Sequence, residues 1–582
     1  MILDKNLPDK KKAEKLVQEL ERMMKERKAF EGTWTEAQAL VSSVILSFDV
    51  REGSSTDGYN VPKRITNRPA NYQETLVSGL CGYGVNPGIK WLELGLEDEE
   101  AMAGYGVKDW LEKIQLAAYN EFDGRNLYGE WKNVIEQATT FGFGVMHVAE
   151  DDSRNEVRYK QIDVPEIFLD TNEYNEYETV FRRFFMTVEN AVSRFGLEAM
   201  NEGIRDRWNL PNNENEKARE IQILHAVFRR KNKKGAFSSR NTDMPFASFF
   251  VDVEERHLIE ESGYRSFPYA IFVWDKAGGK KYPLSPAIKA INDVKLLTKT
   301  EDTRLTLAQM AAKNPIAMPE SMRGINEIFG NDGYIRPGAI YYYDEAKGHD
   351  VPAGINMGGN YPITLDITQQ QADNIKDWFF VDFFLMLQRQ NIHNMTATAV
   401  QALQSEKATV MTNMIVNLKK ALQVVVEITY DLMAMQGRMP ELPFSLIRRR
   451  KGSGLKFVFS SVLSQVQQQL LRYQGTTQFL PVAEKIANLG QVYPPAMEAL
   501  DRFDFDVLLQ NEARAAHVPE TVIREDEDVE AIRAQRAQAL AARDEMEQAK
   551  QDQLTLAQNY NKLNEAPKPG SPAEALFGRQ AG

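Results

Sequence analysis

Cysteine is almost absent from this chain of 582 residues, in which Cys81 is the only one. A lone cysteine excludes an internal disulfide framework and a zinc site built from cysteines. It leaves two interpretations: a small buried side chain, which is the commoner case, or a reactive thiol. The six histidines are scattered and form no His-Glu-x-x-His zinc motif. We therefore expect His147 and His393 to be structural residues, with a ligand role as the alternative.

The sequence also lacks the constellations of an enzyme. It has no Gly-x-x-x-x-Gly-Lys-Ser/Thr loop, and the nearest stretch, Gly278-Gly279-Lys280-Lys281, favours a basic turn. Glu150-Asp151-Asp152 is expected to be a solvated acidic turn, with metal binding as the alternative. No nucleophile and base can be paired by their spacing. The sequence thus predicts no catalytic activity, no cofactor and no metal.

Long apolar runs and an excess of positive charge are missing too. No stretch of about 18 apolar residues occurs, and the polar first twelve residues lack a signal-peptide core, so we expect a cytosolic origin and no membrane-spanning helix. The net charge of −12 argues against tight binding of nucleic acid, which depends on neutralising phosphates. The strongest basic run, residues 448–451, is expected to be a solvated turn, with phosphate contact as the alternative.

What is present predicts a mainly helical α+β protein with several hydrophobic cores, since 43% of the residues are hydrophobic. The first domain should end near residue 284. Its periodicity predicts helices at 10–47, 72–83, 101–123 and 130–140, and strands at 90–94, 141–148, 181–186, 221–230, 246–253 and 269–274. Gly142 and Gly144 should let a helix and the strand after it pack closely.

The rest of the chain is organised around a helical hairpin. Ser285 can cap the outgoing helix, Pro286 suits its first position, and Pro315 forbids continuation past Asn314. Residues 298–304 give that helix a waist that is polar all round, which suggests that it crosses water or packs against copies of itself. The return helix is expected to start at Thr368 in a capping box. Its aromatic-rich run, residues 378–387, should need several neighbours to cover it.

Further elements follow the same logic. A strand is predicted at 339–343 between the two helices, and residues 391–395 form a polar break after them. A long helix is expected from 396 to 436, where Gly437 supplies the stop. A strand at 455–462 should return to the first domain. Helices resume from 465, including an Ala-rich helix at 527–563 that cannot build a core alone, and the tail from 565 is predicted to be disordered.

An ordered series of motifs is similar to that of phage portal proteins, most closely the head-to-tail connectors of short-tailed phages. Leu284-Ser285-Pro286-Ala287 with 292–295 resembles the start of their stem, and 395–400 with Glu406-Lys407 resembles the opening of their long helix. Three further stretches agree in order, namely 141–146, 441–443 and 459–465. Ala399 and Leu403 depart from the usual acid and arginine, which implies that an intersubunit ion pair is missing.

The resemblance implies a portal fold assembled as a ring of twelve subunits, in which neighbouring subunits would cover the polar waist and the aromatic-rich run. Its regions would be the wing (1–284), stem helices (285–313 and 364–390), clip (314–363), tunnel loop (391–395), a long wing helix with its returning strand (396–464) and crown helices (465–564). Such a ring sits at one capsid vertex of the virion, is assembled in the host cytoplasm, and passes double-stranded DNA during packaging and ejection. Implied partners are the terminase large subunit, the tail adaptor, capsid and scaffolding proteins, and internal core or ejection proteins, with no membrane.

Candidate site residues follow from this implied arrangement. Those near the channel or tunnel loop are Lys295, Lys299, Arg304, Arg389, Asn391, His393 and Asn394. The four cations have an equal alternative, pairing with an acid on a neighbouring subunit. Tyr341, Tyr342 and Tyr343 are candidates for contact with the adaptor, because tyrosine is favoured at interfaces. The rival functions are another phage structural or tail protein without a DNA channel, or a packaging-motor enzyme.

Overall fold

The protein was analysed as a computed structural model. It describes residues 7–48, 62–98, 106–151, 156–210, 214–230, 241–276, 278–319, 337, 339–343, 353–354, 361–388, 397–443, 455–459 and 526–564. The chain forms two compact units, Met1–Leu470 and Leu471–Gly582. The first contains every described element except α16 (Asp526–Asn564), which belongs to the second.

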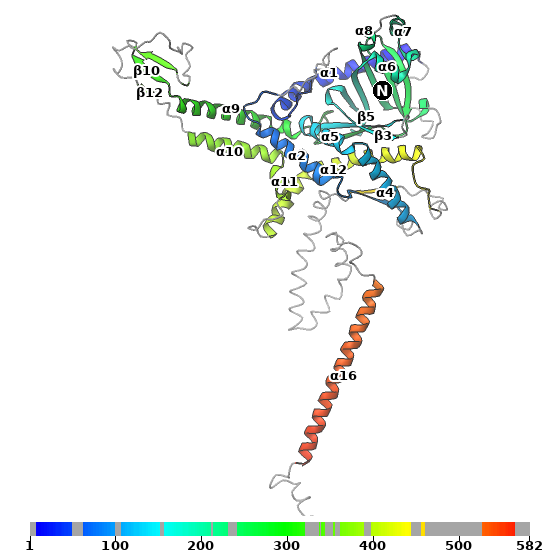
Figure 1. Cartoon of the computed structure of the whole chain (residues 1–582), viewed down its shortest axis with the longest axis vertical. Helices are drawn as coiled ribbons and strands as arrows, with labels where there is room; N and C mark the ends of the chain where they lie inside the picture. Colours follow the sequence, from blue (N-terminus) through cyan, green and yellow to red (C-terminus); the bar gives the residue numbers. More distant parts are fainter. Residues whose placement is uncertain are drawn as a thin grey trace, which may run out of the picture. The chain divides into compact units, whose positions relative to one another are not determined.

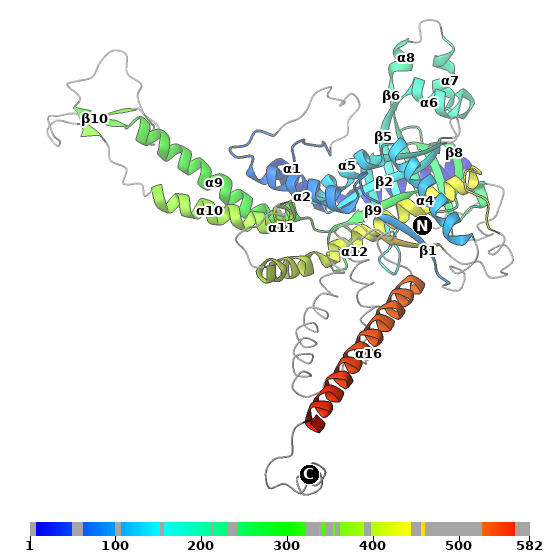
Figure 2. The ribbon, with the colours of Figure 1, turned by 60° about the horizontal axis from the view of Figure 1, so that its bottom comes forward.

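A five-stranded antiparallel sheet forms one layer of the first unit (Figure 1). Its order is β4-β5-β6-β7-β8, with strands Ile167–Thr171, Tyr177–Thr187, Glu220–Arg229, Phe246–Asp252 and His257–Tyr264. The first half of α1 (Asp9–Val41) covers one face through residues such as Leu16 and Leu20, which pack on Phe168 and Phe249. Short helices α6 (Val188–Phe195), α7 (Glu202–Trp208) and α8 (Glu214–Ala218) lie together, and the first two cover the other face (Figure 2).

A second antiparallel sheet, of order β3-β2-β9, joins the first sheet to the helices. Its strands are Glu156–Ile162, Phe143–Asp151 and Tyr269–Val273. Helices α2 (Arg68–Gly84), α4 (Val107–Gly124) and α5 (Leu127–Phe141) pack with it into the largest core, which also contains residues of α9 to α12. Three single-turn helices complete the domain: η1 (Val164–Glu166), η2 (Leu197–Ala199) and η3 (Asn241–Asp243).

The helical hairpin leaves this body as α9 (Pro286–Ala312) and returns as α10 (Tyr361–Trp378), with the two helices side by side in both views. Strands β10 (Ile316–Pro319), β11 (Ile340–Tyr343) and β12 (Ala353–Gly354) lie at its tip. Helix α11 (Val381–Gln388) then takes a different direction, and α12 (Ala397–Met435) follows. The chain finally returns to the first domain, as predicted, through β13 (Leu455–Phe459), which pairs antiparallel with β1 (Leu92–Leu96).

Several predicted boundaries were wrong, among them the starts of α2 (Arg68, not 72) and α5 (Leu127, not 130), and three further differences concern α1 and the return helix. Helix α1 ends at Val41, not 47, because the Arg64 guanidinium donates to its last carbonyls, among them that of Ala39 at 2.7 Å. The return helix starts at Tyr361, not Thr368, since Pro362 is tolerated in a first turn. It is also broken after Trp378, where Phe380 has φ +52°. The end of α12 was correct, with Gly437 at φ +68° just beyond it.

Close contact between α5 and β2 depends on glycine, as the sequence indicated. A Cβ on Gly144 would lie 2.1 Å from the carbonyl oxygen of Val134, and one on Gly142, where φ is +99°, 2.5 Å from that of Pro283. Both obstacles are backbone atoms, which cannot rotate away. The helix, the strand and the segment leading into α9 therefore meet at these two positions.

Gly144→Ala should lower the free energy of unfolding by about 1–3 kcal/mol, because overpacking forces the backbone to shift. The matched control is Gly82→Ala in α2, where an added Cβ meets nothing within 4 Å; it should be neutral or stabilising by about 0.4–1 kcal/mol. Urea unfolding followed by tryptophan fluorescence compares the two. Equal stability of both variants would contradict the close approach.

Two histidines lie where the two large sheets meet, of which His225 is buried and His147 is largely but not fully buried. His147 of β2 and His225 of β6 have ring centroids 5.9 Å apart. His225 Nδ1 lies 2.8 Å from the Tyr269 hydroxyl and its Nε2 3.0 Å from Ser248 Oγ. Burial, with Arg182, Arg194 and Lys160 nearby, lowers the pKa of His147 to about 3. Burial likewise holds the pKa of His225 well below its usual value. Both are therefore neutral structural residues, as expected for His147.

This pair should make the fold sensitive to acid. The folded-state pKa values lie below the unfolded value near 6.5, so the unfolded chain takes up protons first as the pH falls. Stability should be full above pH ~6.5 and fall below it by up to about 1.4 kcal/mol per pH unit for each histidine. Urea titrations between pH ~5.5 and 7 should show a shallower slope for His147→Gln and a nearly flat one for His147→Gln/His225→Gln. An unchanged slope in the double variant would contradict this assignment.

Candidate functional site

The base of the helical hairpin is fixed by Ser285. Its hydroxyl oxygen accepts a hydrogen bond from the amide of Ile288 at 2.9 Å, which caps α9 as predicted. The same hydroxyl donates to the carbonyl oxygen of Thr140 in α5 at 2.8 Å. Ser285 is fully buried. One side chain thus both starts the outgoing helix and fastens it to the body.

Ion pairs extend this attachment along the first half of α9. Lys289 pairs with Asp275, and Lys295 with Glu36 of α1. The return helix is linked as well, since the indole nitrogen of Trp378 donates to Asp293 Oδ2 at 3.0 Å. These contacts give the hairpin a defined direction relative to the α+β body.

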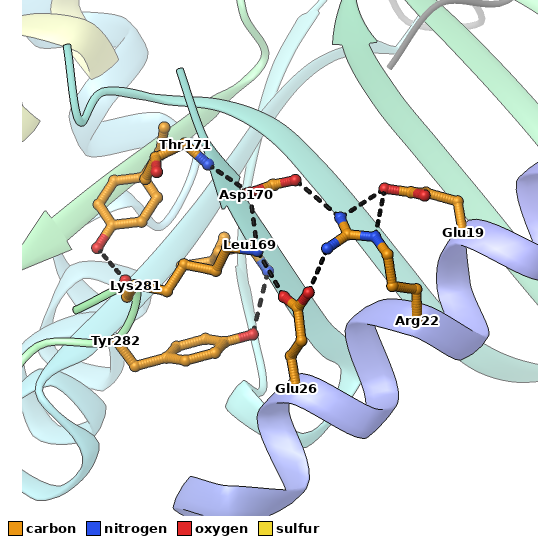
Figure 3. A network of polar contacts seen from close by, with 9 residues as sticks. Glu19, Arg22, Glu26, Leu169, Asp170, Thr171, Lys281 and Tyr282 are labelled. Atoms are coloured by element: carbon orange, nitrogen blue, oxygen red, sulfur yellow. Dashed lines mark hydrogen bonds and ion pairs between the residues drawn. The ribbon is translucent and has the colours of Figure 1, made fainter. Parts of the chain in front are cut away.

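A polar network between α1, β4 and the segment before α9 strengthens the same junction (Figure 3). Lys281, just before α9, lies 2.6 Å from Glu26 Oε2 and 2.9 Å from Asp170 Oδ1, and Arg22 lies 3.0 Å from Asp170 Oδ2. Burial alone would raise the pKa of Glu26, but the hydrogen bond and charge of Lys281 lower it. Sequence patterns missed this network because its members lie far apart in the chain.

Most polar residues in the waist of α9 have partners within the chain. Glu301 is buried, and its carboxylate lies 2.8 Å from Arg304 Nη2 and 3.6 Å from Arg68 Nη2 of α2. The hydroxyls of three threonines donate to the carbonyls four residues earlier at 2.8, 2.8 and 2.9 Å; they are Thr298, Thr300 and Thr303. The waist is therefore a local hydrogen-bonded band of the helix, joined to α2 through Glu301.

The aromatic-rich return segment is covered by its own chain, contrary to expectation. Phe379, Phe383 and Phe384 are buried in the largest core. Phe384 packs so closely on α2 that a Cβ on Gly79 would meet its ring at 2.2 Å. The break at Phe380 is what turns this run away from the hairpin and into the body. Neighbouring subunits are thus not needed to bury these residues.

The hairpin instead exposes aliphatic side chains along both helices. Leu296 and Leu305 of α9 and Leu365 and Ile367 of α10 are between 39% and 51% exposed. On each helix the two side chains point in nearly opposite directions, because they are nine residues apart on α9 and two residues apart on α10.

The predicted channel residues fall into three groups. Lys295 pairs with Glu36, and Arg304 pairs with Glu301, both in the same chain. Each of these two cations therefore already has an ion-pair partner. Lys299 is exposed and takes part in no ion pair found in the described part of the chain. The remaining four predicted residues lie outside the described residues, namely Arg389, Asn391, His393 and Asn394.

The predicted tyrosines lie in the strand at the tip of the hairpin. Strand β10 is central in this small sheet, with β11 parallel to it and β12 antiparallel. Tyr341 and Tyr342 are half-buried, and their strand neighbours are Ala317 and Met318. Tyr343 is placed opposite Pro319. The strand prediction is confirmed, while the binding role of the tyrosines stays a prediction.

The alternatives that involved reactive or metal-binding residues gain no support. Burial raises the pKa of the Cys81 thiol to about 12, which makes it a poor nucleophile. Glu150 accepts a hydrogen bond from Gln436 at 3.0 Å. Among the described residues no group of three His, Cys, Asp or Glu is placed to hold a metal ion.

The basic run 448–451 lies outside the described residues. None of the described helices is long and apolar enough to cross a membrane.

Comparison with known proteins identifies the family. Residues 13–523 match the profile of the bacteriophage head to tail connecting proteins. The chain is 28% identical over 535 residues to a portal protein of Salmonella phage epsilon15, covering 91% of this chain and 92% of that protein. It is 24% identical over 478 residues to a probable portal protein of Bordetella phage BPP-1, covering 79% and 80%. The chain belongs to the bacteriophage head to tail connecting protein family, which confirms the resemblance in its motifs.

Glu301→Gln should loosen α9 from α2, because it leaves two guanidinium groups without their shared carboxylate. The residue is buried but Arg68 and Arg304 are partly exposed, so we expect a loss of about 1–2 kcal/mol in stability. The control is Asp302→Asn on the exposed face of the same turn, with an effect within about 0.5 kcal/mol. Hydrogen exchange of α9 amides should rise in the first variant alone, and equal exchange in both would disprove the link.

Proposed function

We propose that this chain is the portal subunit of a short-tailed phage. In this proposal twelve copies form a ring at one capsid vertex, and DNA is packaged and ejected through its centre. Residues 1–284 would be the wing, 285–313 and 364–390 the stem, and 314–363 the clip. The tunnel loop would be 391–395, and the crown would include α16. The observation that supports this proposal most strongly is that the chain belongs to the bacteriophage head to tail connecting protein family.

The geometry of the hairpin supports the assignment of the stem. It is held firmly at its base by Ser285 and the ion pairs of Lys289 and Lys295, and it projects from the body with exposed leucines on both helices. In a ring each hairpin would lie between two others. The exposed aliphatic residues, of which Leu305 is the most exposed, would then be covered by the next subunit.

The charge of the chain supports passage of DNA rather than retention. Double-stranded DNA carries one phosphate charge per ~1.7 Å of its axis, so a basic lumen would hold it through many contacts. The chain has a net charge of −12, and Lys295 and Arg304 are neutralised locally. Lys299 remains as the described cation best suited to touch passing phosphates, and sparse contacts of this kind let DNA slide.

The partners follow from this position in the virion. We propose that the tip of the hairpin, with Tyr341, Tyr342 and Tyr343, meets the terminase large subunit during packaging and the tail adaptor afterwards. Capsid and scaffolding proteins would contact the ring from outside, and internal core or ejection proteins from within. The ring would be assembled in the host cytoplasm before it becomes part of the virion.

Native mass spectrometry and negative-stain microscopy of the purified chain test the ring directly. We expect closed rings with a central hole, because the exposed aliphatic residues of the hairpin favour association. A stable monomer at micromolar concentration, or open filaments, would favour a structural or tail protein without a channel. ATP or DNA turnover that is lost on a point change in this chain would favour the packaging-motor enzyme.

Replacing the clip should separate assembly from partner binding. Residues 315–362 would be exchanged for a short Gly/Ser linker, which is feasible because α9 and α10 are antiparallel neighbours and loop closure depends only weakly on length. We expect rings by microscopy and loss of binding to the tail adaptor and the terminase. Loss of rings with a folded wing would make the clip the assembly core. Rings that bind both partners would place the docking surface elsewhere.

A further inference from the structure

A pocket of about 220 Å³ lies between the end of α1, helix α5 and the end of β3. Three segments line it, namely residues 42–46 after α1, residues 133–141 of α5, and residues 161–163. At about 30 Å³ for one water molecule, this volume corresponds to roughly seven waters. Val44 and Asn133 are exposed, so the pocket opens to solvent beside them. It therefore has room for one long side chain.

The lining of the pocket combines apolar and acidic side chains. Val44, Leu46 and Phe141 are apolar, and Glu136 and Asp163 carry carboxylates. None of the described residues that line the pocket is a lysine or an arginine. An apolar surface beside negative charge matches a side chain that has an aliphatic stem and a cationic head.

Asp163 is held in place by two amide side chains. Its Oδ1 accepts hydrogen bonds from Gln137 Nε2 at 2.5 Å and from Gln161 Nε2 at 3.1 Å. Gln137 is itself buried, and its Oε1 accepts from the amide of Val164 at 2.9 Å. Within the described part of the chain, Asp163 Oδ2 has no such partner. A carboxylate that is fixed through one oxygen can accept from a ligand through the other with little rearrangement.

Glu136 is half-buried and lacks a cation of its own. Its carboxylate makes no hydrogen bond or ion pair with any residue that the structure describes. Lys132, whose charge acts on it, lies 3.0 Å from Glu74 and is paired there. Burial, and then the charge of Glu74, raise the pKa of Glu136 above its usual value. A half-buried carboxylate without a partner is unfavourable, and a bound cation would remove that cost.

We propose that this pocket binds an arginine side chain of a partner protein. The aliphatic stem lies along Val44 and Leu46, and the guanidinium donates to Glu136 and to Asp163 Oδ2. Arginine fits better than lysine, because a guanidinium is more weakly hydrated than an ammonium group and presents several N–H donors in one plane.

The exposed side chain of Val44 favours a protein over a free cation as the occupant. A small polyamine would leave Val44 in water, whereas the polypeptide on either side of an arginine can cover it. The inference goes beyond the proposed function, since none of the residues that line the pocket belongs to the hairpin or its tip.

Ligand-observed NMR with the full-length chain tests the pocket. The probe is the peptide acetyl-Gly-Arg-Gly-amide, and its matched control carries citrulline, which has the shape of arginine without its charge. We expect saturation transfer to the arginine peptide, with a dissociation constant on the order of 1 mM for a single side chain, and none to the citrulline peptide. Absence of binding, or equal binding of the two peptides, would overturn the proposal.

Neutral variants assign the binding to the two carboxylates. Glu136→Gln and Asp163→Asn should each weaken binding of the arginine peptide about tenfold or more, because each removes one charged acceptor. The control Glu112→Gln makes the same change of charge on an exposed position of α4 and should leave binding unchanged. Equal weakening in all three variants would show unspecific attraction and contradict the pocket.

Thermal unfolding separates binding from a structural role. Because the Glu136 carboxylate has no partner in the described chain, Glu136→Gln should leave the unfolding midpoint unchanged or raise it. A clear fall of the midpoint would mean that Glu136 stabilises the fold, against the proposal. Displacement of the arginine peptide by spermidine at equal concentration would assign the pocket to a free polyamine and overturn the protein partner.

Discussion

The arrangement of this chain depends on the hydrogen bonds of one buried hydroxyl, that of Ser285. It donates to the last turn of α5 and accepts from the first turn of α9, so the direction of the hairpin is set by the α+β body. The crossing is possible because Gly142, with φ +99°, leaves room for the carbonyl of Pro283 beside it. The amide of Trp274 also donates to the carbonyl of Gly142 at 2.8 Å, which brings the end of β9 to the same point. Four segments are fixed to one another at this crossing.

Local chemistry explains what could be predicted from the sequence. A serine before a proline fixed the start of α9, and Gly437 fixed the end of α12, because caps and left-handed residues act within one turn. Strand β11 was recognisable from consecutive aromatic residues. Boundaries set by distant residues were not recognisable. Arg64 ends α1 from 22 to 26 residues away, and the short helices α6, α7 and α8 belong to a stretch in which strands alone were expected.

The candidate site shows the same division between local and distant effects. Sequence placed Lys295, Lys299 and Arg304 on one helix correctly, but the partner of Lys295 comes from α1, and the second partner of Glu301 comes from α2. An amphipathic pattern also cannot tell a face buried by its own chain from one buried by a neighbour. Phe379 and Phe384 were expected to meet other subunits, yet the break at Phe380 directs them into the core of the same chain.

That correction changes which residues are expected to hold copies together. The large aromatic side chains belong to the stability of one subunit, because α2 packs on Phe384 without space even for a methyl group at Gly79. The large apolar side chains that the hairpin leaves exposed are aliphatic and few. Weak contacts repeated around a ring would be enough to build a channel. Each contact needs only to exclude water from a narrow strip of surface, and closure of the ring makes the contacts act together. A strongly apolar stem surface would instead risk association before the subunits are correctly placed.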